Sequence, residues 1–352
     1  MKLGLGLYNH MLNKAHFDFA KQCGCTHLVV HLVDYFNKGN QKKTNDQPIG
    51  DGTGWGIAGK SRNLWEVEEL LRLKKEINDA GLEWEAIENF DPADWYDVLL
   101  DGPLKKKQVE RIKQLIRNVG EAGIPVIGYN FSLAGVCSRT SGAFARGGAV
   151  SVGMDGVDER PIPNGMVWNM TYDQSAADGF IKNISHDELW QRLEYFLNEI
   201  IPVAEEAGVI LAAHPDDPPM PVVRQSPRLV YQPEMYSKLL NVIKSKSNAL
   251  EFCLGSIAEM TEGNVYDATE QYADNIAYIH FRNVRGKVPF YKEVFVDEGD
   301  IDMKRVLTIL KRRNFKGVLI PDHTPQMTCE GPWYAGMAYA LGFMNAAIKM
   351  ID

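Results

Sequence analysis

Short runs of apolar residues recur along the chain, and a longer amphipathic stretch follows each of them. Runs of this length that stop at glycine, proline or polar residues are typical of buried strands. The run at 209–213 is the clearest example, because it ends at His214 and is stopped by Pro215. We expect strands at residues 3–8, 27–32, 82–88, 125–131, 209–213, 250–253, 276–281 and 317–320.

The stretches between these runs place apolar residues three and four positions apart, which is the pattern of an amphipathic helix. A glycine often separates such a stretch from the next strand, as Gly81 and Gly123 do. Ser185 and Glu188 have the spacing of a capping box, which marks the start of a helix. We expect helices at residues 14–22, 63–80, 104–122, 185–208, 233–244, 263–273, 302–313 and 334–350.

Eight strand–helix units in succession predict a parallel sheet, because parallel strands need crossover connections. The number favours an α/β fold, a single-domain (β/α)8 TIM barrel over residues 1–352. A doubly wound open sheet is the alternative. It would need a glycine-rich phosphate loop early in the chain, and Gly4-Leu5-Gly6 lacks the third glycine and the helix start after it.

Two long segments interrupt this pattern. Residues 37–61 and 132–184 are rich in glycine and polar residues and show no clear periodicity. Loops of this length in a compact domain are usually functional or disordered. We therefore expect inserted βα loops there, and the second is a candidate lid over the site.

Composition narrows the function without naming it. The chain has 352 residues and a net charge of −8, with acids and bases interspersed, so nucleic acid is not an expected partner. The apolar runs are too short to span a bilayer, so no membrane association is expected, and the N-terminus lacks the pattern of a signal peptide. Five cysteines without framework spacing indicate a reducing compartment, and we expect the cytoplasm.

Metal-competent side chains stand where four successive strands are predicted to end. In a TIM barrel the active site lies at the carboxyl ends of the strands. There the chain carries His214, Cys253, His280 and Asp322. Imidazole, thiolate and carboxylate together suit a borderline divalent metal such as Mn²⁺, Fe²⁺, Co²⁺ or Zn²⁺. The earlier strand ends carry His31 or Asp34, Glu88 and Asn130, and His323 is left unassigned.

Each of these residues also has an ordinary structural interpretation. A histidine at a strand end is more often a satisfied polar residue than a ligand, and a lone cysteine such as Cys253 is commonly a small core residue. The segment His-Pro-Asp-Asp-Pro-Pro at 214–219 could be a simple turn. Only the joint occurrence of four candidate ligands at the ends of four successive strands favours a metal site.

Several stretches resemble the mannonate dehydratases, a TIM-barrel family related to the xylose-isomerase-like enzymes. The resemblance spans most of the chain in order. It rests on Tyr-Asn-Phe at 129–131, His-Pro-Asp-Asp-Pro-Pro at 214–219, Phe-Cys at 252–253, His-Phe-Arg-Asn-Val at 280–284, Glu-Gly-Asp-Ile-Asp-Met at 298–303, Pro-Asp-His at 321–323 and Tyr334.

The resemblance implies a hydro-lyase that converts D-mannonate to 2-keto-3-deoxy-D-gluconate by β-elimination, with Mn²⁺, or with Fe²⁺ or Co²⁺. It implies His214, Cys253, His280 and Asp322 as metal ligands and Asp322 with Tyr334 as the acid/base pair. It places Arg282 and Asn283 near the substrate. Asn130 at the fourth strand end, and Arg139 as an alternative holder of the substrate carboxylate, complete the expected site. Barrels of this type often associate, so a homo-oligomer is also expected.

Two other enzymatic functions remain open as hypotheses. The first is a dehydratase of another sugar acid, because Asn89-Phe90-Asp91-Pro92 and Cys137-Ser138-Arg139-Thr140 depart from the family's motifs. The second is a metal-dependent sugar isomerase or epimerase on the same barrel, although such sites usually rely on carboxylate ligands. A non-enzymatic carbohydrate-binding barrel would need a vestigial metal site.

Overall fold

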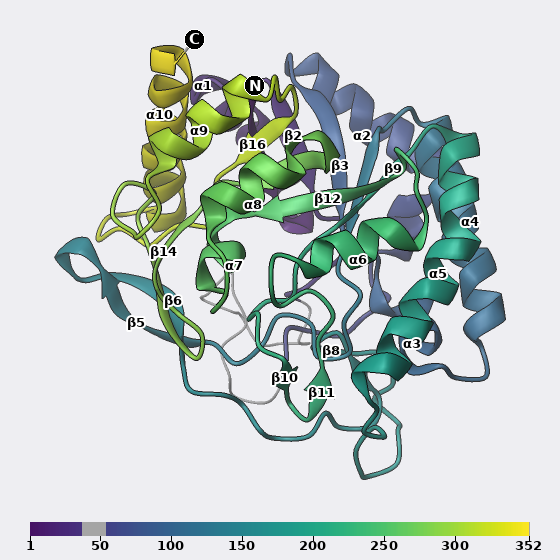
Figure 1. Ribbon diagram of the computed structural model, residues 1–352. Helices are drawn as coiled ribbons and strands as arrows, with labels where there is room; N and C mark the ends of the chain where they lie inside the picture. Colours follow the sequence, from purple (N-terminus) through teal and green to yellow (C-terminus); the bar gives the residue numbers. More distant parts are fainter. Residues whose placement is uncertain (37–53, 352) are drawn as a thin grey trace.

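The computed structural model describes residues 1–36 and 54–351. Parallel strands close into a barrel in which β16 pairs back onto β1, with Val318 opposite Lys2 (Figure 1). Around the barrel the strands are β1 (Lys2–Leu7), β2 (His27–Val30), β3 (Glu83–Glu88), β4 (Val126–Tyr129), β9 (Ile210–Ala213), β12 (Asn248–Cys253), β13 (Ile276–His280) and β16 (Val318–Ile320). Each coincides with a predicted strand, and the expected barrel is confirmed.

Helices surround the barrel at the predicted places. They are α1 (Lys14–Gln22), α2 (Val67–Asp79), α4 (Lys105–Glu121), α5 (His186–Ala207), α6 (Met235–Val242), α8 (Val265–Tyr272), α9 (Met303–Arg312) and α10 (Pro332–Ile351). The predicted start of α2 at residue 63 is wrong. Residues Arg62–Trp65 form the 3-10 turn η2, and Glu66 is extended, so the helix begins only at Val67.

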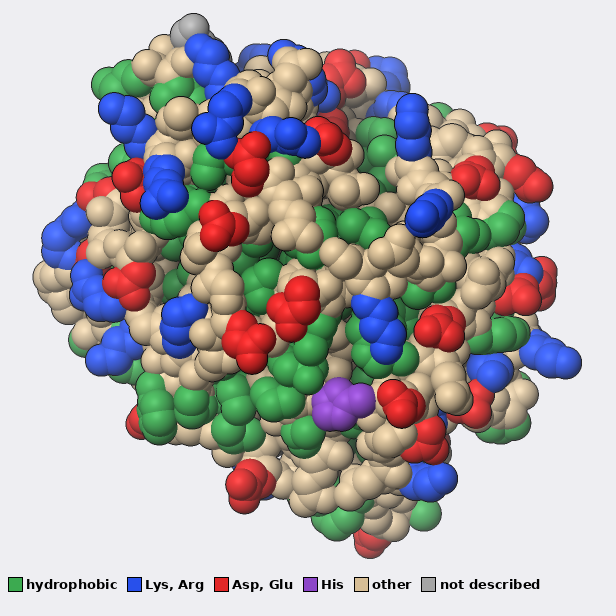
Figure 2. Space-filling view, viewed as in Figure 1, with side chains coloured by type: hydrophobic (Ala, Val, Ile, Leu, Met, Phe, Trp, Pro, Cys, Tyr) green, Lys and Arg blue, Asp and Glu red, His purple; other side chains and the backbone are tan. Residues whose placement is uncertain are grey.

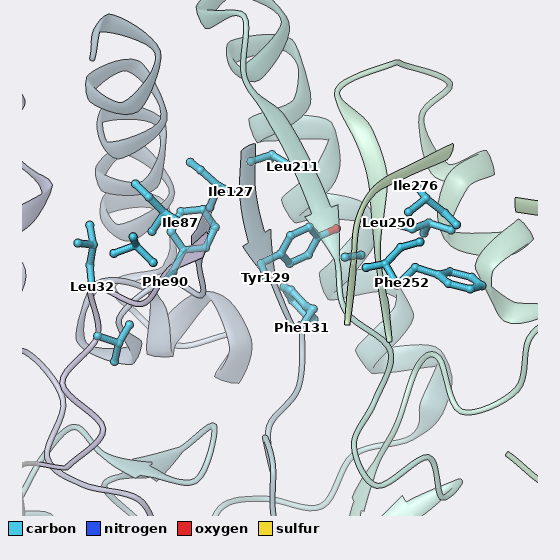
Figure 3. Close-up of a cluster of buried hydrophobic side chains, with 14 of the residues drawn as sticks. Leu32, Ile87, Phe90, Ile127, Tyr129, Phe131, Leu211, Leu250, Phe252 and Ile276 are labelled. Carbon is cyan, nitrogen blue, oxygen red and sulfur yellow. The ribbon is translucent and has the colours of Figure 1, made fainter. Parts of the chain in front are cut away.

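The alternation of side chains along the strands separates two apolar layers. One layer fills the inside of the barrel and is built largely from small or β-branched residues. Its buried members are Val29, Ala86, Val126, Ala212, Tyr278, Val318 and Ile320. The other layer lies between strands and helices and includes Ile87, Ile127, Leu211, Leu250 and Phe252 (Figure 3). Because the period is two, the last inward position of each strand falls at the same mouth of the barrel.

The expectation that residues 132–184 form an irregular loop is wrong in part. This segment contains β5 (Thr140–Ala145), β6 (Ala149–Asp155), β7 (Met166–Val167) and β8 (Met170–Thr171). β5 and β6 join β15 (Phe290–Val294) and β14 (Asn283–Lys287) in an antiparallel sheet of order β14-β15-β6-β5. β5 and β6 pair with each other as a local hairpin, whereas β6 also pairs with β15, more than a hundred residues later. Gly153 opposite Lys292 interrupts the side-chain pattern of β6, so local periodicity gave no signal.

Several short elements were not anticipated. They are α3 (Pro92–Leu100), α7 (Leu254–Glu259), β10 (Val222–Val223), β11 (Ser226–Pro227) and the 3-10 turns η1 (Asn9–Met11), η3 (Arg146–Gly148) and η4 (Ala273–Asn275). Helix α3 is short and almost entirely buried, so it lacks the polar face that reveals a surface helix.

The first expected loop, at 37–61, falls mostly outside the described residues, at 37–53. Its described part lies against the segment around β8, where the Trp55 N–H donates to the Asn169 carbonyl at 2.8 Å. On the outer surface, acidic and basic side chains are interspersed over the face shown in Figure 2. Among the helices of the described residues, none is long and apolar enough to cross a membrane.

Helix α5 is held at its start by the predicted capping box. The Glu188 N–H donates to Ser185 Oγ at 3.1 Å, and the Ser185 N–H donates to Glu188 Oε2 at 2.7 Å. We expect Ser185→Ala to lower the free energy of unfolding by about 1 kcal/mol, because the helix loses a side-chain cap. Urea denaturation of the two proteins measures this difference, with Ser185→Asp as the capped control. An unchanged midpoint in Ser185→Ala would contradict it.

Candidate active site

Three side chains from neighbouring strands converge at the mouth of the barrel. One ligand atom from each of His214, Cys253 and His280 lies within 4.8 Å of the other two. Cys253 and His280 are opposite each other in the register of β12 and β13, and His214 directly follows β9. Asp322 follows β16, and its Oδ2 is 3.5 Å from His280 Nδ1. The structure therefore brings the four predicted metal ligands together.

Hydrogen bonds orient both histidine rings. His214 Nδ1 is 2.6 Å from the Pro215 carbonyl, which can only accept, so Nδ1 carries a proton and Nε2 is the nitrogen left to face the ligand cluster. His280 Nε2 lies 3.2 Å from Glu88 Oε2 and 3.2 Å from Glu251 Oε1. His280 Nδ1 has no hydrogen-bond partner among the described residues. Each ring thus presents one nitrogen toward the ligand cluster.

The surroundings of Cys253 favour the thiolate. Burial raises the pKa of this thiol, but the Arg282 guanidinium and His214 outweigh burial and hold the pKa well below its usual range. The Ser256 hydroxyl also lies 3.3 Å from the sulfur and can donate to it. The thiolate is the metal-binding form of cysteine, so the donor set fits a borderline divalent cation.

Asp322 has a backbone conformation that turns the chain sharply after β16. Its φ is 66°, in the left-handed region that aspartate tolerates better than most residues. Three groups contact its Oδ2: His280 Nδ1 at 3.5 Å, Arg282 Nε at 3.3 Å and His323 Nε2 at 3.2 Å. A non-glycine residue held in this conformation at a strand end is consistent with a functional role.

Asp322 and His323 form a pair of opposite charge on the pocket wall. Burial raises the pKa of Asp322, but His323 and His280 outweigh it and hold this pKa well below the usual range. Burial lowers the pKa of His323, but Asp322 and Glu293 outweigh it and raise this pKa to about 10. At neutral pH the pair is therefore a carboxylate beside an imidazolium, and His323 Nδ1 is held 2.6 Å from Glu293 Oε2.

A small hollow opens above the ligand cluster. Polar and aromatic groups from both halves of the chain form its walls. They are Tyr8, His31, Trp55, Glu88, Asn89, Asn130, Val136, Arg139, Trp168, His214, Asp217, Glu251, His280, Asp322 and His323. The long segment at 132–184 contributes Val136, Arg139 and Trp168, so it forms part of the wall.

Two of the predicted substrate-binding residues lie on this wall. Arg139 Nη2 donates to Asp217 Oδ2 at 2.5 Å, and the Arg139 side chain is almost completely buried. Asn130 Nδ2 donates to the Pro215 carbonyl at 3.2 Å, and its Oδ1 accepts from Trp168 Nε1 at 3.2 Å. Both side chains are therefore fixed before any ligand enters.

The other two predicted substrate contacts lie behind the wall. Arg282 donates to Glu259 Oε1 at 2.7 Å and to Asp217 Oδ2 at 3.0 Å, so protein carboxylates engage its guanidinium. The side-chain amide of Asn283 donates to the backbone carbonyls of Val296 and Ile301 at 2.9 and 3.0 Å. Neither residue lines the hollow. The structure thus places Arg282 beneath the ligand cluster and Asn283 in a structural position.

Tyr334 is not brought to the pocket either. It lies at the start of α10, is 40% exposed, and its Oη is 3.0 Å from His16 Nε2. Its ring packs edge-on against Phe19, with ring centroids 4.9 Å apart. In this conformation the expected acid/base residue faces α1 rather than the metal ligands.

Sequence reasoning missed several wall residues. Glu251 and Asp217 are buried carboxylates, and Trp55 and Trp168 form an aromatic pair with ring centroids 5.5 Å apart. Glu251 had a visible signal, because it is an acid inside an otherwise apolar strand at 249–253. The tryptophans had none, since they belong to the two segments without periodicity.

The comparisons with known proteins agree with the family resemblance seen in the sequence. The model of the D-mannonate dehydratase (UxuA) family matches residues 46–349. The mannonate dehydratase of Streptococcus suis strain 05ZYH33 is 36% identical over 280 residues, which cover 74% of each chain. That of Lactococcus lactis subsp. cremoris MG1363 is 33% identical over 286 residues, covering 74% of this chain and 78% of that one.

Solved structures give the same result. The crystal structure of mannonate dehydratase from Streptococcus suis serotype 2 superposes with a TM-score of 0.75 at 30% identity, covering 100% of this chain and 93% of that chain. D-Psicose 3-epimerase from Clostridium cellulolyticum H10 superposes with a TM-score of 0.60 at 12% identity, which shows a shared fold only. The chain belongs to the D-mannonate dehydratase family.

Proposed function

We propose that this protein is a metal-dependent hydro-lyase that converts D-mannonate to 2-keto-3-deoxy-D-gluconate. One observation carries the proposal: His214, Cys253 and His280 meet within 4.8 Å at the barrel mouth, with Asp322 beside His280. This is the donor set expected from the family resemblance. Family membership supports the reaction and the substrate.

Mn²⁺ is the proposed ion, and Fe²⁺ or Co²⁺ are proposed substitutes, since two imidazoles, a thiolate and a carboxylate suit borderline cations. His214 Nε2, His280 Nδ1, Cys253 Sγ and a carboxylate oxygen of Asp322 would hold it. When bound, the ion offsets the negative charge that develops on the substrate as its C2 proton leaves.

Arg139 is the proposed partner of the substrate carboxylate, since it lines the hollow and guanidinium groups bind carboxylates through paired hydrogen bonds. Asn130, held by Trp168 and Pro215, would donate or accept toward a substrate hydroxyl. Arg282 lies beneath the ligand cluster, where it stabilises the Cys253 thiolate and contacts Asp322.

The charge states of Asp322 and His323 fit the two proton transfers of the reaction. Asp322 is ionised and can take the proton from C2 of the sugar acid. The electron pair of that C–H bond becomes the C2–C3 double bond, and the C3–O bond breaks. His323 is protonated and can give its proton to the departing hydroxyl, which leaves as water. The enol that results then tautomerises to the 2-keto product.

We also propose that the protein works in the cytoplasm as a homo-oligomer. All five cysteines are unpaired, which suits a reducing compartment. The oligomer is an expectation from barrels of this type.

Turnover of D-mannonate tests the proposed function. Metal-stripped protein is reconstituted with Mn²⁺ and supplied with D-mannonate or with its C2 epimer D-gluconate as the matched control, and 2-keto-3-deoxy product is measured. We expect product from D-mannonate alone, and none after addition of a chelator. Metal-loaded protein that makes no product from D-mannonate, or that prefers D-gluconate, would contradict the substrate.

A further inference from the structure

We propose that Glu88 and Glu251 are positioning residues that hold His280 by its Nε2 side, so that Nδ1 is directed to the ligand cluster and would be the atom that holds the metal. The inference rests on the metal centre proposed above and adds two residues that are not among its proposed ligands.

The geometry around His280 supports this role. Its Nε2 lies 3.2 Å from Glu88 Oε2 and 3.2 Å from Glu251 Oε1, one carboxylate on β3 and the other on β12. Of these two contacts, the one with Glu88 Oε2 has hydrogen-bond geometry, and a carboxylate oxygen that accepts this bond places the proton on Nε2. A metal-binding histidine commonly gives its second N–H to a carboxylate, which fixes both the tautomer and the ring orientation.

Burial of these two carboxylates lowers the stability of the fold unless they are paired. Glu251 is 1% exposed and Glu88 is 6% exposed, and both point inward at the mouth of the barrel. A buried carboxylate destabilises a fold unless it is paired, and an apolar side chain would fill the same space at no such cost. Within the described residues, the one imidazole that both carboxylates reach at 3.2 Å is that of His280.

The barrel also makes room for Glu251. Gly128 on β4 stands opposite Glu88 and Ala212 in the strand register. A Cβ at position 128 would collide with Tyr278 Oη and with Glu251 Oε2. A glycine at position 128 is therefore required for this arrangement of Glu251 and Tyr278. It leaves room beneath His280 for the Glu251 carboxylate.

His214 provides an internal contrast. Its second nitrogen is held by the backbone carbonyl of Pro215, which no side-chain substitution removes. His280 depends on side chains alone, so its orientation can be released by mutation. This difference makes the proposal testable without touching a metal ligand.

The experiment measures Co²⁺ binding by competition with a chromophoric chelator, and records the visible spectrum of the Co²⁺ protein. We expect Glu251→Ala to weaken Co²⁺ binding by about 10- to 100-fold. The Co²⁺ d–d bands should shift because the His280 ring is released, while the charge-transfer band from Cys253 remains. Glu251→Gln keeps an acceptor oxygen and should recover most of the affinity.

Glu83→Ala is the matched control, because Glu83 stands at the exposed start of β3 and should leave affinity and spectrum unchanged. If Glu251→Ala does not fold, Glu88→Ala and Glu88→Gln provide the same comparison. A purely structural role would lower thermal stability without moving the d–d bands, and would overturn the proposal.

The number of Co²⁺ ions bound per chain separates the remaining outcomes. Two Co²⁺ ions per wild-type chain, with one lost in Glu251→Ala, would overturn the proposal in favour of a second ion bound by Glu88, Glu251 and His280. Wild-type protein that binds no Co²⁺ would overturn both this proposal and the metal centre. Tight binding with the predicted shifts, but no turnover of D-mannonate, would support the positioning role and reject only the proposed reaction.

Discussion

Replacing Cys253 by serine is expected to weaken divalent metal binding on the order of a hundredfold. Structural four-ligand sites bind Zn²⁺ with roughly 10–16 kcal/mol, which is about 3 kcal/mol per ligand and two powers of ten in affinity. Serine keeps the size of the side chain but offers a neutral hydroxyl. The environment that favours the thiolate, Arg282 and His214, has no comparable effect on a hydroxyl of much higher pKa.

The measurement is a Mn²⁺ titration of the metal-free proteins, followed by metal content after desalting. Cys137→Ser is the matched control, because Cys137 is also buried near the pocket but lies against Arg228 rather than among the ligands. Its affinity for Mn²⁺ should equal that of the wild type. Equal metal content in Cys253→Ser and wild-type protein would remove Cys253 from the ligand set.

Replacing His323 by glutamine is expected to lower kcat by about 10²- to 10⁴-fold, the usual contribution of a general acid, while metal binding persists. His323 is the protonated group nearest to Asp322 on the pocket wall. Glutamine can still hydrogen bond to Glu293 and Asp322 but has no proton to give to the leaving hydroxyl. The measurement is steady-state turnover of D-mannonate at saturating Mn²⁺, with metal content determined in parallel.

Tyr334→Phe is the comparison that separates the two assignments of the acid. The family resemblance implies Tyr334 as one member of the acid/base pair with Asp322 and leaves open which of them is the acid, whereas the structure places the Tyr334 hydroxyl 3.0 Å from His16 Nε2, outside the hollow. We expect Tyr334→Phe to have a small effect on kcat and His323→Gln to have a large one. The reverse result would restore Tyr334 as the acid, and would require the start of α10 to move into the pocket during catalysis.

The strands and the ligand set could be predicted because both follow from local sequence. Most barrel strands are short apolar runs, and the ligands lie at or just after the strand ends, as His214 after Ala213 shows. The barrel then brings these ends together, whichever loops connect them. Predicting the four ligands therefore needed only the strand boundaries and the fold.

The remaining parts of the site depend on contacts that sequence does not reveal. Arg282 follows a strand end just as the ligands do, but the absence of a side chain at Gly255 lets it turn beneath Cys253. Tyr334 was expected at the site from the resemblance alone, and its placement depends on how α10 packs against α1. The antiparallel sheet joins two local hairpins, β5 with β6 and β14 with β15, through the pairing of β6 with β15, and these two strands are more than a hundred residues apart, so no local pattern predicts that sheet.

The most direct test of this account is a metal titration of catalysis. Metal-free wild-type protein receives increasing Mn²⁺, and the initial rate of 2-keto-3-deoxy product formation from D-mannonate is recorded at each step. We expect the rate to rise in proportion to the amount of bound Mn²⁺ and to level off at one ion per chain. Full activity in metal-free protein, or a fully loaded protein that leaves D-mannonate unchanged, would contradict it.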